Sequence, residues 1–488
     1  MGEARTIGRI FTDLAEEDPN RPSVTCDGST ASRLDLERRA NRLARAYAEL
    51  GVNAGDFVTI GLPNSIEFYE ATVATWKLGA VPQPVSAKLP ARERQAIVDL
   101  ADPAIVVGAD EADHPGRVCI PAGFVPGSSL DDAPLPEVVS PSWKAPTSGG
   151  STGRPKLIVA GQEGKFDPDL LAMVFRMERN DCHLVPGPLY HNAPFSLSTV
   201  GLFMGHHLVV LTKFDADVAL RAIGDHGVNW MNLVPTMMLR MLRAVQADPD
   251  RYDLSSLRVV WHMAAPCPEW LKEAWIELIG PEKLMELYGG TEGQASTIIS
   301  GTEWLEHRGS VGKPLTGQMK VLDAEGNLAP PGEVGEIYMR RFDGTAPTYH
   351  YIGAEPRELD GWESLGDLGW MDDDGYVYLS DRRTDLILAG GANIYPAEVE
   401  AAIDEHPRVL SSIVVGIPDD DLGQRVHAMV QPDGEVTVDE LIAHLQERLV
   451  RYKIPRSFEF IDEPLRDDAG KARRTAMRDA AIERLRNG

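Results

Sequence analysis

The chain has 488 residues, of which 43% are hydrophobic and 25% charged, and its formal net charge is −26. This length predicts more than one domain, and the composition is that of a globular protein. The acidic charge argues against a nucleic-acid partner, because phosphate backbones are bound by clustered Lys and Arg. No apolar stretch is long enough to span a bilayer, and the polar N-terminus lacks the apolar core of a signal peptide, so we expect a soluble cytoplasmic protein.

The N-terminal half alternates helical and strand-like patterns. Apolar residues recur at helical spacing over residues 36–50, Gly51 follows as a C-cap, and residues 57–60 read as a short buried strand. Ser65 can begin a second helix that ends at Gly79. The alternation continues with strands at 208–211, 230–234 and 258–263 and helices at 218–226 and 237–247. Strands that alternate with helices indicate βαβ units and a largely parallel sheet.

The pattern changes in the C-terminal half. Over residues 312–378, short β-like runs are separated by Pro-Gly and Asp-Gly turns, which indicates a small antiparallel subdomain. After Arg382 a compact unit restarts, with helices at 396–405 and 438–451 and a strand at 411–416. We therefore expect an α/β fold: a large domain over 1–383 with βαβ-type sheets and a small β-rich subdomain, then a small α+β domain over 384–488.

One segment, residues 147–156, carries the clearest chemical signal. It holds three glycines, four hydroxyl residues and a lysine: Thr147, Ser148, Gly149, Gly150, Ser151, Thr152, Gly153 and Lys156. Glycines allow close backbone approach, successive N–H groups form anion-binding nests, and lysine adds a point charge. The spacing differs from a Walker A loop, because Arg154 and Pro155 separate Gly153 from Lys156. The segment predicts a polyphosphate site; a Gly/Ser-rich linker is the alternative.

Residues 287–293 form a second candidate. Tyr288 offers a flat face for a purine beside Gly289 and Gly290, and Thr291 can donate to a phosphate oxygen. Glu292 is a hard oxygen ligand of the type that Mg²⁺ prefers beside nucleotide phosphates. A glycine-rich turn with a solvated acid is the alternative.

Further residues in the C-terminal half bear on the same chemistry. Asp367, on a turn, can bind both ribose hydroxyls, and Arg382 can bridge to ribose or phosphate. The paired Gly390 and Gly391 fit a loop that changes conformation or lets a ligand chain slide past. Lys471 near the C-terminus would, taken alone, be solvated surface.

Together and in this order, these motifs resemble the adenylate-forming superfamily of acyl-CoA synthetases, nonribosomal adenylation domains and luciferases. The resemblance runs from about Phe11 to about Arg478. The sequences TSGGSTGRPKLI, HMAAPCPEW and ELYGGTEGQA look most like the acyl-CoA ligase branch, in particular its bile-acid-CoA-ligase-like members.

The resemblance implies that a carboxylic acid attacks the α-phosphate of ATP, and that a thiol, usually that of CoA, then displaces AMP. It places residues 147–153 and Lys156 on the β- and γ-phosphates, Glu292 on Mg²⁺ and Thr291 on the α-phosphate. Lys471, on a mobile C-terminal domain, would bridge the acid and the α-phosphate. The nucleoside would be held by Asp367 and Arg382 at the ribose and by Ala264, Ala265, Pro266 and Tyr288 at the adenine.

The resemblance says less about which residues bind the carboxylic acid. His191 stands where the family has an aromatic or His residue, which makes it a candidate gate between carboxylate and thiol; a packed histidine is the alternative. His262 and Met263 stand where many relatives have Ser-Gly or Gly-Gly, so Met263 would fill part of the pocket and His262 could recognise a polar group. The expected pocket comprises Tyr190, His191, Trp230, Asn232, Leu233, His262, Met263 and Gly290.

Two positions depart from the family pattern. The hinge position is Thr384, where relatives usually have Asp or Lys, and Ala392 replaces the acidic residue that usually follows the thiol-tunnel glycines Gly390 and Gly391. The expected enzyme is an AMP-forming acid–CoA ligase, monomer or homodimer, that uses ATP, Mg²⁺, CoA and a medium-to-large or aromatic acid. The alternative is an adenylating enzyme with another acceptor: an amine, a carrier-protein thiol, or an aromatic amine diazotised through activated nitrite. A binding protein that lost catalysis is a second alternative.

Overall fold

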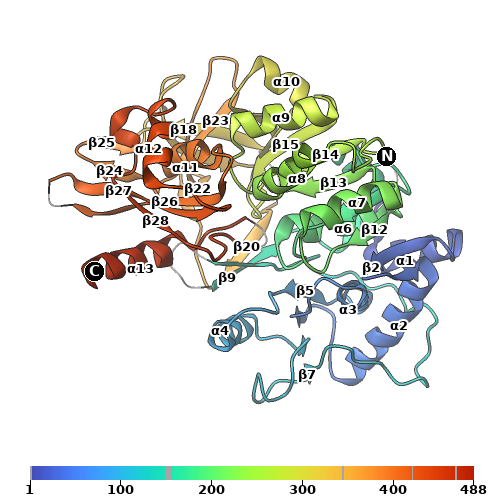
Figure 1. Ribbon diagram of the computed structural model, residues 1–488. Coiled ribbons are helices and arrows are strands. Elements are labelled where there is room, and N and C mark those ends of the chain that lie inside the picture. The colour runs from blue at the N-terminus through green and yellow to red at the C-terminus, as the bar shows by residue number, and fades with distance from the viewer. Residues whose placement is uncertain (1–2, 150–154, 343–345, 420, 468–469, 488) are drawn as a thin grey trace.

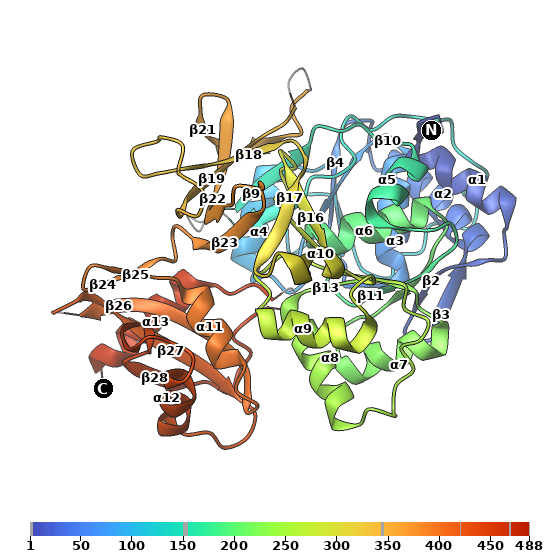
Figure 2. The same cartoon turned by 90° about the horizontal axis from the view of Figure 1, so that it is seen from above.

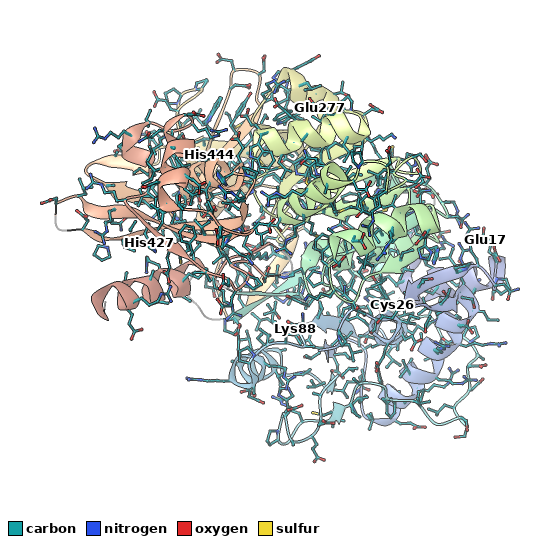
Figure 3. The ribbon with its side chains drawn as sticks, in the orientation of Figure 1. Glu17, Cys26, Lys88, Glu277, His427 and His444 are labelled. Atoms are coloured by element: carbon teal, nitrogen blue, oxygen red, sulfur yellow. The ribbon has the colours of Figure 1, made fainter. Side chains whose placement is uncertain are left out.

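The computed structural model describes residues 3–149, 155–342, 346–419, 421–467 and 470–487. A large N-terminal domain, from blue to light orange in Figure 1, is followed by a small C-terminal domain in dark orange and red. Side chains fill the space between sheets and helices in both domains (Figure 3). Among the described residues, no helix has the combination of length and apolarity that crossing a membrane requires.

The largest sheet has fourteen strands in the described part of the chain, and half of it is parallel. The parallel strands come from βαβ units, as the alternating pattern predicts. In spatial order this half contains β3 (Ser29–Ser32, antiparallel at the edge), β2 (Pro22–Cys26), β12 (His207–Val210), β11 (Cys182–Val185), β13 (Trp230–Leu233), β14 (Val259–His262) and β15 (Leu284–Gly289).

Neighbouring residues of these strands enter different cores, because side chains alternate across a sheet. Leu184 and Met231 pack against one group of helices, whereas Val185 and Trp230 pack against the other. The first group is α7 (Ala216–His226), α8 (Pro235–Ala247) and α9 (Glu269–Ile279). The second is α1 (Ile7–Glu17), α2 (Arg33–Glu49), α3 (Ile66–Lys77) and α6 (Asn192–Phe203). The helix predicted from residue 36 begins earlier because Ser32 and Asp35 form a capping box.

The other half of the large sheet is antiparallel, as the Pro-Gly and Asp-Gly turns predict. Its strands are β16 (Ser296–Ser300), β17 (Ser310–Thr316), β23 (Val377–Arg382), β22 (Trp362–Met371), β19 (Gly335–Arg340), β18 (Gln318–Leu322) and β21 (Arg357–Leu359), with α10 (Gly301–Glu306) beside β16. The register sets Asp367 of β22 directly opposite Arg382 of β23. Two residues distant in sequence therefore become neighbours in the ladder.

Three smaller sheets complete the large domain. A parallel sheet contains β5 (Val81–Pro84), β4 (Phe57–Ile60), β6 (Ile105–Val107) and β7 (Cys119–Ile120), near α4 (Ala91–Ala101). An antiparallel sheet pairs β20 (Tyr349–Ile352), β9 (Pro155–Ala160) and β8 (Thr147–Gly149). The third pairs β1 (Arg5–Thr6) with β10 (Lys165–Phe166), which precedes α5 (Pro168–Phe175).

The C-terminal domain is a five-stranded sheet with helices on both faces (Figure 2). Its strands are β25 (Ala392–Ile394), β24 (Ile387–Ala389), β27 (Gly423–Pro432), β26 (Val409–Asp419) and β28 (Ser457–Phe460). Helices α11 (Pro396–Asp404) and α12 (Val438–Gln446) share one core, and α13 (Arg474–Asn487) lies on the other face. The helix expected to reach residue 451 stops at Gln446, and a short 3₁₀ turn (Arg451–Lys453) leads to β28.

Candidate active site

The predicted phosphate segment begins in β8 and ends in β9. Thr147 is paired with Leu157 in this antiparallel ladder, and Ser148 with Lys156. Gln83 fixes the start of the segment, because its Nε2 donates to Thr147 Oγ1 at 2.7 Å while its Oε1 accepts from Thr59 at 2.6 Å. The strands therefore bring Lys156 back beside Ser148. The predicted Gly150, Ser151, Thr152 and Gly153 lie outside the described residues.

Lys156 meets Glu292 from the second predicted segment. Its Nζ lies 3.4 Å from Glu292 Oε1 and 3.8 Å from the ring centre of Tyr351. The Tyr351 hydroxyl donates to the same Glu292 oxygen at 2.5 Å. Burial and the Glu292 charge raise the pKa of Tyr351 far above its ordinary value, so Tyr351 remains a donor. Glu292 is only 6% exposed, so these partners stabilise a buried carboxylate.

Little space is left for a side chain at position 290, in the turn that carries Glu292. A side chain at Gly290 would bring its Cβ within 2.5 Å of Leu365 and 2.8 Å of Glu292 Oε2. Thr291 follows in the same turn and is half-buried, and Gly289 is exposed. Because Gly290 has no side chain, the space beside the Glu292 carboxylate stays open.

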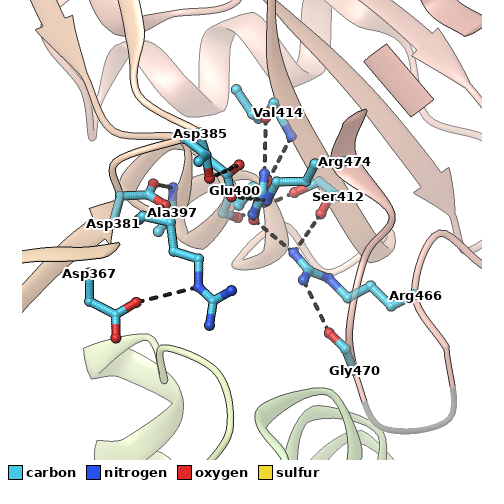
Figure 4. Close-up of polar contacts among 12 residues, drawn as sticks. Asp367, Asp381, Asp385, Ala397, Glu400, Ser412, Val414, Arg466, Gly470 and Arg474 are labelled. Atoms are coloured by element: carbon cyan, nitrogen blue, oxygen red, sulfur yellow. Dashed lines mark hydrogen bonds and ion pairs between the residues drawn. The ribbon is translucent and has the colours of Figure 1, made fainter. Parts of the chain in front are cut away.

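Tyr288, Asp367 and Arg382 form one connected group. The Tyr288 hydroxyl donates to Asp367 Oδ2 at 2.9 Å, and Arg382 Nε lies 3.4 Å from Asp367 Oδ1. Figure 4 shows Asp367 reaching towards the guanidinium. Burial, with the Asp367 charge, raises the pKa of Tyr288 well above its ordinary value. The group offers a carboxylate fixed in orientation and a guanidinium that is 65% exposed.

The segment predicted to face the adenine contains a backbone outlier. Ala264 has φ of 74°, a left-handed conformation that alanine rarely adopts. Ala264 and Pro266 are exposed, whereas Ala265 is half-buried. Strained backbone of this kind clusters at ligand sites, which agrees with the predicted position.

The loop before Lys471 is built around Asp467. Asp467 Oδ1 accepts from the Lys471 N–H at 2.9 Å, and the Asp467 carbonyl accepts from Gly470. The His191 ring from the large domain lies 3.7 Å from the same carboxyl group. This loop therefore lies beside the N-terminus of α6.

The Lys471 side chain lies within electrostatic reach of two predicted site residues. Protein surroundings lower the pKa of Lys471, although its side chain keeps contact with solvent. Arg382 lowers the pKa further, whereas Asp467 and Glu292 raise it. Lys471 thus lies within range of the charges of Arg382 and Glu292, which come from distant parts of the sequence.

Glu400 is a buried carboxylate that is connected through Arg466 to the loop before Lys471, which we call the lysine loop (Figure 4). It accepts from Arg466 at 2.7 Å and from both terminal nitrogens of Arg474. Arg466 also donates to the carbonyl of Gly470 at 3.3 Å. Burial raises the pKa of Glu400, but Arg474 and Arg466 outweigh this effect and leave it below its ordinary value. We call Glu400, Arg466 and Arg474 the arginine clamp.

The predicted hinge and tunnel residues lie at the start of the small domain. Thr384 is exposed in the turn between β23 and β24 and donates to Asp385 Oδ1 at 3.2 Å. Gly390 and Gly391 form the β24–β25 hairpin turn with φ of 58° and 83°. This hairpin lies at the outer edge of the small domain (Figure 2).

The residues predicted for the acid pocket divide into two groups. Tyr190 and His191 are half-buried, with ring centres 4.3 Å apart. Trp230 and His262 are completely enclosed: the Trp230 indole donates to the Phe175 carbonyl. His262 lies 3.8 Å from Glu286, and burial lowers its pKa to about 4 despite that carboxylate. Asn232 and Met263 are also buried, 4% and 6% exposed. His262 therefore faces the interior in this structure.

Comparison with known proteins decides the family. The profile described as AMP-binding enzyme matches residues 11–350, and the profile described as AMP-binding enzyme C-terminal domain matches residues 398–471. The chain belongs to the AMP-binding enzyme family. Its fold class and its nature as an adenylate-forming enzyme are thereby confirmed. No cluster of three or more His, Cys, Asp or Glu side chains suited to a metal occurs in the described part of this enzyme.

Several characterised proteins resemble this AMP-binding enzyme over nearly their whole length. The fatty acid–[acyl-carrier-protein] ligase ScoC of Streptomyces coeruleorubidus is 31% identical, with 98% of this chain and 96% of that protein covered. The 2-succinylbenzoate–CoA ligase of Bacillus licheniformis is 30% identical, covering 94% and 97%. The o-succinylbenzoate CoA synthetase of Bacillus subtilis, solved with its acyl-adenylate, superposes with a TM-score of 0.82 at 26% identity, covering 98% and 99%.

Sequence reasoning missed several residues that support the site. Tyr351 could have been found from the alternation Tyr349-His350-Tyr351, which places two tyrosines on one face of a strand. Glu400 lies in the segment 396–405, which was predicted only as a helix, and no local signal marked Gln83.

Proposed function

We propose that this AMP-binding enzyme activates a carboxylic acid with ATP and then transfers the acyl group to the thiol of CoA. The observation that carries the proposal is that Lys471 lies within range of the charges of Glu292 and Arg382, where Glu292 contacts Lys156 and Arg382 contacts Asp367. Phosphoryl and adenylyl transfer depend on positioning and charge stabilisation, and this group supplies both.

In the first half-reaction, an acid oxygen attacks the α-phosphorus, an O–P bond forms, and the bond to pyrophosphate breaks. We assign Lys471 to the developing negative charge between carboxylate and α-phosphate, and Thr291 to an α-phosphate oxygen. Asp367 would bind the ribose hydroxyls while Arg382 and Tyr288 hold its orientation. Lys156 and the segment from Thr147 would bind the outer phosphates.

The residues present fit a Mg²⁺ ion that arrives with ATP. Glu292 is a single buried carboxylate beside Lys156, and Mg²⁺ in nucleotide sites typically binds one or two carboxylates together with phosphate oxygens. When bound, the ion neutralises charge on the phosphates. Glu292 would hold it, and Tyr351 would keep Glu292 in place through its hydrogen bond.

The second half-reaction requires the thiol to reach the acyl carbon, so that a C–S bond forms and AMP leaves. We propose that the small domain rotates about Thr384 and brings the Gly390–Gly391 turn to the site. Arg243 of α8 donates to the carbonyls of Asp404 and His406 in the small domain, and a small hollow between the domains is lined by Thr236, Met237 and Arg240 on one side and by Ser411, Gln431 and Arg466 on the other. Interfaces of this kind permit domain motion. His191 would separate the acid from the incoming thiol.

The acid is proposed to be medium-to-large or aromatic. The half-buried Tyr190 and His191 offer ring faces on which an aromatic or alkyl chain can pack. The names of the relatives, which act on 2-succinylbenzoate and on fatty acids, agree with this class.

The test measures AMP and pyrophosphate release from Mg-ATP with aryl, amino-aryl, fatty and sterol acids, with and without CoA, and identifies products by mass spectrometry. Acid-dependent AMP with an acyl-CoA product supports the proposal. AMP release that ignores CoA but responds to an amine or nitrite overturns the thiol step.

A Lys471→Ala variant tests the assigned residue. Adenylate formation should fall at least about a hundredfold, whereas thioester formation from a supplied acyl-adenylate should persist. Lys453→Ala is the matched control, because Lys453 lies in the same domain but pairs with the surface residue Glu398 at 2.6 Å. Unchanged adenylation in Lys471→Ala would refute the assignment.

A carrier-protein thiol is the second candidate acceptor, because one relative of 31% identity is named as an acyl-carrier-protein ligase. Incubation of the enzyme, ATP and acid with a phosphopantetheinylated carrier protein or with CoA separates the two. A mass increase of the carrier protein without an acyl-CoA product would favour this acceptor.

A further inference from the structure

Lys144 is a buried ammonium group that the adenylation chemistry does not use. Its side chain is 7% exposed and lies 4.4 Å from the ring centre of Trp143. Its Nζ donates to Asn192 Oδ1 and to Ser196 Oγ, the latter at 2.6 Å. Among the described residues no carboxylate pairs with it, and burial lowers its pKa to about 7. An unpaired buried ammonium is unfavourable, so it marks a candidate functional site.

The partners of Lys144 lie on the part of α6 that is open to solvent. Asn192 and Ser196 are half-exposed, one helical turn apart, whereas residues 197–203 are buried. Asn192 directly follows His191, which lies 3.7 Å from Asp467 in the lysine loop. Lys144 therefore lies directly behind a surface that adjoins the proposed reaction site.

The hydrogen bonds fix what this surface offers to a ligand. An ammonium group can only donate, so the Asn192 atom that faces it must be the carbonyl oxygen. Ser196 Oγ donates to the same oxygen at 3.2 Å. With its oxygen held by two donors, Asn192 is left with its two N–H donors, and Lys144 adds a positive charge behind them. This combination selects an anionic acceptor.

We propose that Asn192, positioned by Lys144 and Ser196, binds a second carboxylate of the acid substrate; the inference rests on the proposed acid activation. The carboxylate being adenylated is the weaker alternative, because adenylation would remove its charge and leave Lys144 unpaired again. A second carboxylate keeps its charge through both half-reactions and gives Lys144 a lasting partner.

The test compares acids of equal shape with and without the second carboxylate. Terephthalate is paired with 4-isopropylbenzoate, and glutarate with 5-methylhexanoate, at saturating Mg-ATP, and pyrophosphate release gives kcat and KM for each. We expect the wild type to prefer the dicarboxylate at least about tenfold in kcat/KM in one pair, since sites built for hydrogen bonding reject analogues that lack the group. Lys144→Met and Asn192→Leu should bring that ratio towards one, mainly through a higher KM for the dicarboxylate.

Thr199→Val is the matched control, because Thr199 is a buried residue of the same helix whose hydroxyl bonds only to backbone carbonyls. It should keep the wild-type ratio. The inference is overturned if the wild type adenylates both members of each pair equally, which leaves the proposed acid activation intact. It is also overturned if kcat/KM of the variants falls by the same factor for both acids of a pair. A structural role of Lys144 and Asn192, or a contact with the reacting carboxylate, would have that effect. If no acid releases AMP, the proposed function itself fails.

Discussion

Replacement of Glu400 by glutamine should damage both the stability of the small domain and the placement of Lys471. Glu400 is 5% exposed and receives charge-assisted hydrogen bonds from Arg466 and Arg474. Glutamine keeps one acceptor, but its NH₂ group would face guanidinium donors. Breaking a buried ion pair by removing one partner costs about 3–5 kcal/mol. That is a large share of the roughly 5–15 kcal/mol that stabilises a domain.

The effect on catalysis follows from the contact between Arg466 and Gly470. Arg466 holds the Gly470 carbonyl at 3.3 Å, directly before Lys471, so a displaced Arg466 releases the loop. A misplacement of about 1 Å in a catalytic group can reduce a rate about a hundredfold. We therefore expect Glu400→Gln to slow adenylate formation by ten- to a hundredfold. Thioester formation from a supplied adenylate should change less.

Urea unfolding followed by circular dichroism, and pyrophosphate release from the folded enzyme, measure the two effects separately at pH 7–8. The arginines hold the pKa of Glu400 below its ordinary value, so its contribution is complete above about pH 5 and is lost only on acidification. Glu405→Gln is the matched control, because Glu405 also binds an arginine, Arg448, through both oxygens, but at the partly exposed end of α11. The Glu405→Gln variant should lose less than about 1 kcal/mol of unfolding free energy. The reasoning fails if Glu400→Gln unfolds and adenylates like the wild type, or if Glu405→Gln is affected equally.

Three other changes test neighbouring parts of the site. Tyr351→Phe removes the donor to Glu292 and should raise the Mg²⁺ concentration needed for half-maximal adenylation several-fold; an unchanged magnesium titration would contradict the support role. Asp367→Asn should raise the KM for ATP by at least about tenfold, and it should reduce the difference in KM between ATP and 2′,3′-dideoxy-ATP. If the variant keeps the wild-type difference between these two nucleotides, Asp367 does not bind the ribose hydroxyls. Lys144→Met should remove a pH dependence of stability: the folded pKa near 7 lies below the unfolded value, so above about pH 7 the native protein without bound acid has lost this proton while the unfolded state still binds it. The unfolding free energy of the wild type should therefore rise relative to the variant by about 1.4 kcal/mol per pH unit between pH 7 and 9, and parallel curves would show that Lys144 titrates normally.

Local patterns predicted most of the fold, because apolar periodicity records which faces are buried. The alternation of strands and helices over residues 208–263 predicted the parallel half of the large sheet. The capping box at Ser32 and Asp35 was overlooked, so the helix start was placed too late. The pairing of β9 with β20 depends on residues almost two hundred positions apart, and no local signal specifies such a register.

The candidate site could be predicted where one residue carries the chemistry, and not where a network does. Lys156, Glu292 and Asp367 stand in motifs with glycines and turns that mark ligand contact. Tyr351 and the arginine clamp act through long-range contacts, so only the structure brings them together. The role of His262 stays a prediction: its side chain is buried and lies beside Glu286 of the neighbouring strand, a long-range pairing that the local sequence does not specify.

The anchoring of the chain on either side of Thr384 explains how this position can serve as a hinge without a charged side chain. On the N-terminal side, the Arg383 N–H donates to the Gly366 carbonyl at 2.9 Å, so Arg383 belongs to the large domain. On the C-terminal side, Asp385 pairs with Arg474 at 3.2 Å, which ties it to the arginine clamp of the small domain. Thr384 is the residue between these two anchors, and its hydroxyl donates to its neighbour Asp385. We therefore expect the proposed rotation of the small domain to be confined to the backbone dihedrals around Thr384 and to move the arginine clamp and Lys471 together. Because a hinge works through its φ and ψ angles, threonine can take the place of a charged residue here.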